Sequence, residues 1–146
     1  MPTARRSRTI AAPVEELWEV IGDPHHLPRW WPRVDRVEDV DGDAFTEVMT
    51  TSKGKVVRAD FRLVQVEEGA GRLRWEQRVQ GTPFANLLKS ATTEVQLTPA
   101  GAVTEVTIEL RQALNGVFSR VGAYMVNRAA ARTLEGALDG LERISG

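Results

Sequence analysis

Cysteine is the most informative absence, because none of the 146 residues is a cysteine. Disulfides, cysteine-based zinc fingers and thiol nucleophiles are therefore excluded. An excess of charge is also lacking, since 19 Lys and Arg residues offset 20 Asp and Glu residues to leave a net charge of -1. No overall field attracts nucleic acid or an anionic membrane. We expect no nucleic-acid partner, and any other partner must be recognised through local features of the surface.

Long apolar runs are absent as well. No window approaches the roughly 18 apolar residues of a membrane-spanning helix, and the arginines of MPTARRSRTI precede no apolar signal-peptide core. We therefore expect a soluble, cytoplasmic protein without an integral membrane segment. Catalytic signatures are missing too, because no serine lies in a nucleophile-elbow motif and no glycine-rich phosphate loop is present.

The residues that are present indicate one folded domain. Hydrophobic residues make up 42% of the chain and charged residues 27%, which is typical of globular proteins rather than disordered ones. A chain of this length supports one core and is too short for two substantial ones. We expect residues 1–146 to form that single domain.

The order of elements is the clearest pattern in the chain. Residues 3–11 favour a strand, and APVEELWEVIGD has the helical spacing, early acids and terminal glycine of a short helix. The segment DPHHLPRWW adds one or two helical turns before Pro32 ends them. Turn signals then divide residues 34–112 into six strands, and residues 116–144 predict a long helix. The turn signals lie at 41–43, 52–55, 67–71, 81–84 and 98–101.

Two of the expected strands alternate polar and apolar residues. In VVRADFRLV the apolar phase contains Phe61, and in LRWEQRV it contains Trp75 and Gln77. Alternation of this kind gives a sheet with one dry and one solvated face. A buried Gln77 needs a hydrogen-bond partner, which a ligand, a cavity water or another protein group could supply.

The apolar stripe of the long helix carries a polar interruption. Leu134, Leu138 and Leu141 form a continuous stripe that we extend toward Tyr124, yet Asn127 and Arg128 fall beside it. Either these groups reach solvent or they line a polar cavity. We predict an internal pocket with a ligand whose polar end lies near the helix. Its expected polar boundary is Tyr124, Arg128 and Gln77, and its expected apolar wall is Phe61, Trp75 and Trp30.

Two segments carry a resemblance to a known family. The order of elements, together with IAAPVEELWEVIGDPHHLPRWWPRV and LTPAGAVTEVTIEL, resembles the helix-grip (SRPBCC) superfamily. That group includes polyketide cyclases and dehydrases, START-type lipid carriers, coenzyme Q-binding proteins and pollen-allergen-like proteins. The resemblance implies an α+β fold in which a curved antiparallel sheet of about seven strands grips the C-terminal helix. It also implies an apolar cavity between the two layers.

The segment DPHHLPRWW matches a family pattern through Asp23, Pro28 and Trp30. The resemblance implies that this segment closes one end of the grip. Trp30 is expected as a packing anchor, while Trp31 is free to face ligand or solvent. The adjacent histidines, His25 and His26, lack metal-ligand spacing, so we expect exposed side chains and no metal.

The sequence favours a binding function without assigning a ligand. We expect a small hydrophobic or amphipathic molecule, such as a lipid, a quinone or a polyketide-like compound, and no cofactor. The expected ligand-binding residues are Trp30, Trp31, Phe61, Trp75, Gln77, Tyr124 and Arg128. One alternative is a polyketide cyclase or dehydratase, and another is an interaction module like the Hsp90 activators. No catalytic residue is assigned, and a monomer and a homodimer are both compatible with the sequence.

A cyclase would work mainly by folding a flexible substrate in a shaped pocket, with modest acid–base help. That alternative gives Arg128 or Tyr124 the task of polarising a carbonyl. It gives His25 or Gln77 the task of relaying a proton or orienting a hydroxyl.

Overall fold

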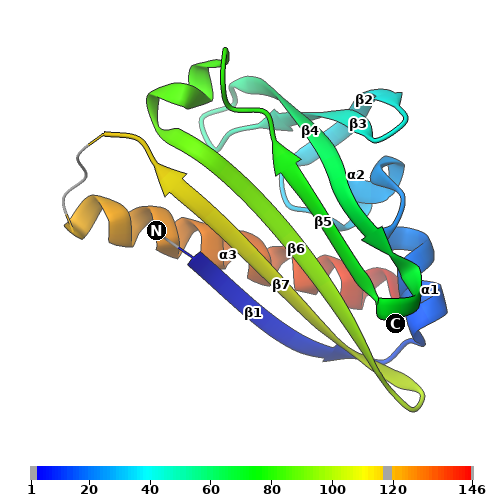
Figure 1. The fold of residues 1–146 in the computed structure, drawn as a ribbon. Coiled ribbons are helices and arrows are strands. Elements are labelled where there is room, and N and C mark those ends of the chain that lie inside the picture. Colours follow the sequence, from blue (N-terminus) through cyan, green and yellow to red (C-terminus); the bar gives the residue numbers. More distant parts are fainter. Residues whose placement is uncertain (1–2, 117–119, 146) are drawn as a thin grey trace.

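A seven-stranded antiparallel sheet curves around one long helix in the computed structural model, which describes residues 3–116 and 120–145 (Figure 1). The sheet order is β1-β7-β6-β5-β4-β3-β2. The strands are β1 (Thr3–Ile10), β2 (Val34–Asp41), β3 (Ala44–Thr50), β4 (Val56–Glu67), β5 (Arg72–Gln77), β6 (Leu88–Ala100) and β7 (Val103–Leu114). The helices are α1 (Val14–Ile21), α2 (Leu27–Trp30) and α3 (Arg120–Ser145), with short 3-10 turns at Pro24–His26, Glu68–Ala70 and Pro83–Asn86.

This architecture confirms the fold class expected from the sequence. One strand, two short helical segments, a six-strand meander and a long helix follow one another as predicted. The predicted helix start at Gly116 is displaced, because Gly116 adopts a positive φ of 78° before α3. Val117, which the sequence places in the helix, lies outside the described residues.

The proline-rich corner, residues 23–32, lies between β2 and α3 and packs against both. Asp23 begins it by accepting a hydrogen bond from the His25 backbone N–H at 3.0 Å. The chain then brings α2 against α3, so closely that a Cβ added at Gly140 would lie 2.3 Å from the Trp30 carbonyl oxygen. Trp30 itself is 2% exposed, which confirms the packing anchor.

The C-terminal half of α3 fills the space under the sheet. Leu134, Leu138 and Leu141 are fully buried with Val106 and Ile108 of β7, as the sequence predicts. Among the described residues no helix is long and apolar enough to cross a membrane.

The N-terminal half of α3 departs from the predicted stripe. Tyr124 is 61% exposed and Arg128 also faces solvent. A helix returns to the same face after three or four residues, so the buried stripe continues from Leu134 back through Ala130 and the half-buried Asn127. Tyr124 and Arg128 lie to one side of this stripe, where the helix surface is exposed, which explains why the predicted extension of the stripe was wrong.

Candidate functional site

A cavity of about 130 Å³ lies between the inner face of the sheet and α3. Strands β3 to β7 supply most of its wall, and Trp31 and Thr133 close it from the α2 corner and from α3. Its lining residues are Trp31, Glu47, Met49, Phe61, Trp75, Gln77, Phe84, Ala91, Thr93, Leu110, Gln112 and Thr133.

Strand register explains why these residues meet. Directly opposed residues of antiparallel strands point to the same face of a sheet. Phe61 of β4 is paired with Gln77 of β5. Trp75 is paired with Thr93 of β6, which is paired in turn with Leu110 of β7. The predicted inward phase of β4 and β5 is therefore confirmed.

Two tryptophans, Trp31 and Trp75, line the apolar end of the cavity. The Trp31 and Trp75 ring centroids are 5.5 Å apart in an edge-to-face arrangement, and Trp30 lies 5.3 Å from Trp31 in the same geometry. Trp31 is half-buried and lines the cavity, whereas Trp30 packs behind it. Aromatic pairs in this geometry are stabilising beyond the area they bury. The contacts with Trp30 and Trp75 therefore hold the Trp31 ring in place at the edge of the cavity.

Glu47 is the ionisable residue of the cavity, and like Thr93, Gln112 and Thr133 it was not among the residues predicted from the sequence. It is only 2% exposed, and its cross-strand neighbours are Val37 of β2 and Ala59 of β4. The signal was available, because alternation along AFTEVMT puts Glu47 on the same face as Phe45 and Met49. A lone glutamate among apolar residues is more commonly solvated, and only the packed structure shows that this one is enclosed.

The surroundings of Glu47 favour its uncharged form. Burial raises the pKa of its carboxyl group to about 8, because removal from water penalises the charged form. Within the described residues no cation and no hydrogen-bond partner contacts this carboxyl group. Perturbed carboxyl groups of this kind gather at functional sites.

Neutral polar groups complete the site. Gln77, Thr93 and Gln112 come from the sheet. Thr133 comes from α3, where its hydroxyl already donates to the Ala129 carbonyl at 3.2 Å. The wall therefore combines aromatic surface with several uncharged hydrogen-bonding groups, an arrangement suited to orienting an apolar molecule.

The structure brings together only part of the predicted site. Trp31, Phe61, Trp75 and Gln77 line the cavity. Tyr124 and Arg128 do not, since both side chains are exposed on the outward face of α3. The predicted polar boundary on the helix is therefore wrong, and the polar groups of the cavity lie mostly on the sheet.

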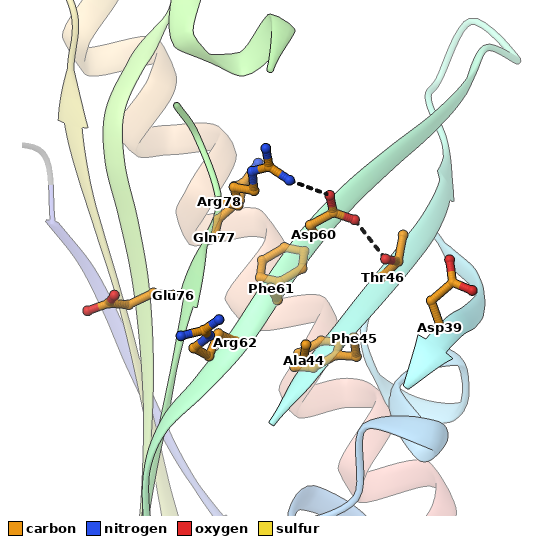
Figure 2. A pocket seen from close by; sticks show the side chains of 10 residues that line it. All are labelled: Asp39, Ala44, Phe45, Thr46, Asp60, Phe61, Arg62, Glu76, Gln77 and Arg78. Carbon is orange, nitrogen blue, oxygen red and sulfur yellow. Dashed lines mark hydrogen bonds and ion pairs between the residues drawn. The ribbon is translucent and has the colours of Figure 1, made fainter. Parts of the chain in front are cut away.

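A larger hollow, of about 480 Å³, is lined by residues of β3, β4 and β5 and shares Phe61 and Gln77 with the inner cavity (Figure 2). Asp60 accepts a hydrogen bond from Thr46 at 2.7 Å and pairs with Arg78 at 3.9 Å. Arg62 lies directly across from Glu76 on the neighbouring strand. These opposite charges are solvated and offset one another, so the smaller inner cavity is the better candidate for a ligand site.

Metal binding finds no support in residues 3–116 and 120–145, where no group of three or more His, Asp or Glu side chains could hold an ion. His25 bonds through Nδ1 to Asp23 at 2.8 Å on the surface.

The fold and cavity define a helix-grip protein, a curved sheet wrapped around a C-terminal helix with a cavity between the two. Residues 1–146 match the family described as polyketide cyclase / dehydrase and lipid transport. The chain belongs to this family. A comparison with curated proteins finds no match.

Solved structures show the same architecture at low sequence identity. A START superfamily protein from Mycobacterium smegmatis is 15% identical with a TM-score of 0.77, and the match covers 98% of this chain and 96% of that one. Ara h 8.0201 is 16% identical with a TM-score of 0.78, again over 98% and 96%. The di-domain ARO/CYC protein BexL, from the BE-7585A biosynthetic pathway, is 19% identical with a TM-score of 0.80, over 98% of this chain and 46% of BexL. At these identities the likeness establishes the fold.

Proposed function

We propose that residues 1–146 act as one ligand-binding domain that holds a small hydrophobic or amphipathic molecule in the internal cavity. The observation that carries this proposal is the cavity itself, in which Trp31, Trp75 and Phe61 supply apolar wall beside uncharged polar groups. A lipid, a quinone and a polyketide-like compound all combine an apolar body with a few polar atoms. The family description and the START-type neighbour support the same class of ligand.

Binding can be tested in two ways. Native mass spectrometry of freshly purified protein should show an adduct if a ligand is retained. Titration with isopropylbenzene should change tryptophan emission, because two of the four tryptophans line the cavity.

A matched pair of variants localises the probe. Ala91→Leu places a larger side chain in the cavity, while Ser90→Leu adds the same side chain at an exposed position of β6. We expect weaker isopropylbenzene binding in Ala91→Leu alone. Equal affinities in both variants would place the probe elsewhere and overturn the proposal.

A cyclase or dehydratase activity is the second candidate, and Glu47 is the observation that favours it. A buried carboxyl group with a pKa of about 8 can exchange a proton near neutral pH. Such chemistry begins with proton removal beside a carbonyl, so the test is deuterium exchange at the methyl group of acetophenone, followed by NMR. Faster exchange with the unmodified protein than with Glu47→Gln supports an enzyme, and equal rates oppose it.

A further inference from the structure

Glu47 is the one ionisable side chain among the described residues that line the cavity. Its carboxyl group has neither a hydrogen bond nor an ion pair within the described part of the chain. Native proteins rarely leave a buried polar group unpaired, because the lost hydrogen bonds to water are not replaced. An unpaired group that faces a cavity therefore indicates that something in the cavity completes its hydrogen bonding.

The two residues paired with Glu47 on the flanking strands carry no charge. They are Val37 and Ala59, so the charged residues at alternate positions of β2 and β4 lie on the outer face. These outward residues are Arg36, Glu38, Arg58 and Asp60.

The other charged groups near this region also lie at the surface. Asp39 pairs with Arg58 at 3.2 Å on the outer side, and Asp35 accepts a hydrogen bond from Thr50. On α3, Arg132 precedes the cavity-lining Thr133 but is exposed. Nothing among these residues offers a buried positive charge to an anionic ligand.

We propose that Glu47, as a neutral carboxylic acid, donates a hydrogen bond to the carbonyl oxygen of an apolar ligand, so that the cavity prefers ketones, aldehydes or esters to carboxylates of the same shape. This inference rests on the proposed ligand-binding function. A carboxylate ligand would be buried without a cation and would lie near a second carboxyl group, which is unfavourable on both counts. A carbonyl compound supplies the acceptor that the acid lacks.

The protonation state sets the pH range of this preference. Because burial raises the Glu47 pKa to about 8, the carboxyl group carries its proton at neutral pH and can act as a donor. Above that pH it ionises and becomes an acceptor only. The preference for carbonyl ligands should therefore be present at about pH 6 and disappear at about pH 9.

The size of the cavity selects the probes. An engineered apolar cavity of about 150 Å³ binds benzene, and the cavity here is about 130 Å³. Single-ring compounds are therefore appropriate. Acetophenone, isopropylbenzene and benzoate share nearly the same shape and differ in their polar end, which is a carbonyl group, an apolar branch or a carboxylate.

The experiment measures the dissociation constants of these three probes by NMR of the tryptophan indole N–H signals. At about pH 6 the unmodified protein should bind acetophenone roughly threefold to tenfold more tightly than isopropylbenzene, which is the range expected for one net hydrogen bond. Benzoate should bind most weakly. At about pH 9 the advantage of acetophenone should vanish, while isopropylbenzene should bind at both pH values.

Two variants separate the hydrogen bond from the charge. Glu47→Leu removes the donor and should bind acetophenone and isopropylbenzene equally. Glu47→Gln keeps an N–H donor that does not titrate, so its preference for acetophenone should persist at both pH values. The Gln variant and the pH series test the inference even if Glu47→Leu fails to fold.

The two proposals fail in distinguishable ways. Binding of both neutral probes with equal affinity at about pH 6 would overturn the role of Glu47 and leave the ligand-binding function intact. Tighter binding of benzoate than of acetophenone would also overturn it. Absence of binding by all three probes would overturn both proposals.

Discussion

The two ends of the layer between the sheet and α3 differ in how completely they are packed. At the C-terminal end Leu134, Leu138 and Leu141 are fully buried, and the Trp30 backbone contacts the helix at Gly140. Toward the other end Thr133 borders a cavity. The filled end holds the layers together, which allows the hollow end to keep polar groups that a filled core would exclude.

The largest expected effect compares the same substitution at the two ends. Leu138→Ala should lower the free energy of unfolding by about 3 to 4 kcal/mol, because a fully buried leucine leaves a new cavity in a packed region. Leu110→Ala should cost about half as much, since Leu110 is half-buried and already borders an open space. Urea denaturation measures both free energies of unfolding. Equal losses would show that the region around Leu110 is packed as tightly as the region around Leu138.

The second expected effect is a pH dependence that belongs to the hollow end. The folded-state pKa of Glu47 is about 8, above the ordinary glutamate value in the unfolded chain, so the folded state binds the extra proton between these values. Stability should therefore fall as pH rises through this interval, by about 1.4 kcal/mol per pH unit.

Glu47→Gln isolates this contribution. In this variant the free energy of unfolding should lack the decrease with pH that Glu47 causes. Urea denaturation of both proteins from about pH 5 to about pH 8 measures the effect. Subtracting one curve from the other removes the contribution of all other titrating groups. Parallel curves for the two proteins would show that Glu47 is not held in an apolar environment.

The third expected effect probes the close contact at the filled end. Gly140→Ala should destabilise the protein by about 2 kcal/mol, because the new Cβ would lie 2.3 Å from the Trp30 carbonyl oxygen and the surrounding backbone must move. Helix propensity alone favours alanine by about 1 kcal/mol, so the sign of the change is diagnostic. A stabilised Gly140→Ala would contradict the packing of α2 on α3.

Gly136→Ala is the matched control for that contact. Its Cβ would meet the Cγ of Pro32 at 2.7 Å, which is a side-chain atom in a turn rather than backbone. We therefore expect a smaller loss than at Gly140, measured in the same denaturation series.

The smallest expected effect concerns the outward face of α3. Arg128→Leu should change the free energy of unfolding by no more than about 0.5 kcal/mol, since the side chain is exposed and has no ion pair within the described residues. Isopropylbenzene should bind the variant as it binds the unmodified protein. A severalfold loss of affinity would instead support the pocket boundary that the sequence predicted.

The strand phases show how far the sequence could predict the candidate site. Alternation placed Phe61, Trp75 and Gln77 on the inner face, and all three line the cavity. The same reasoning applied to β3 would have included Glu47. A period of two residues assigns a strand residue to a face, but it does not reveal whether that face is filled, hollow or covered at that point.

The helix shows why the other half of the site could not be predicted. Tyr124 and Arg128 lie one turn apart, and either could have continued the leucine stripe within the tolerance of a sequence pattern. A rotation of the helix by a fraction of a turn decides which residues face the sheet. That rotation is determined by contacts with α2 and β1, which are distant in sequence.

The sequence by itself determined the order of strands and helices, the dry face of β4 and β5, the proline-rich corner and the absence of any thiol chemistry. These properties follow from local periodicity, backbone restriction and residue chemistry, all of which depend only on residues close together in the sequence. Only the tertiary structure decided where the layers leave a cavity, and that Glu47 lies buried there with a pKa of about 8. The Glu47 carboxyl group is buried by residues of β2, β4 and elements farther away in the sequence. These residues surround it only after the chain has folded, so its raised pKa could not be predicted from the residues next to it in the sequence.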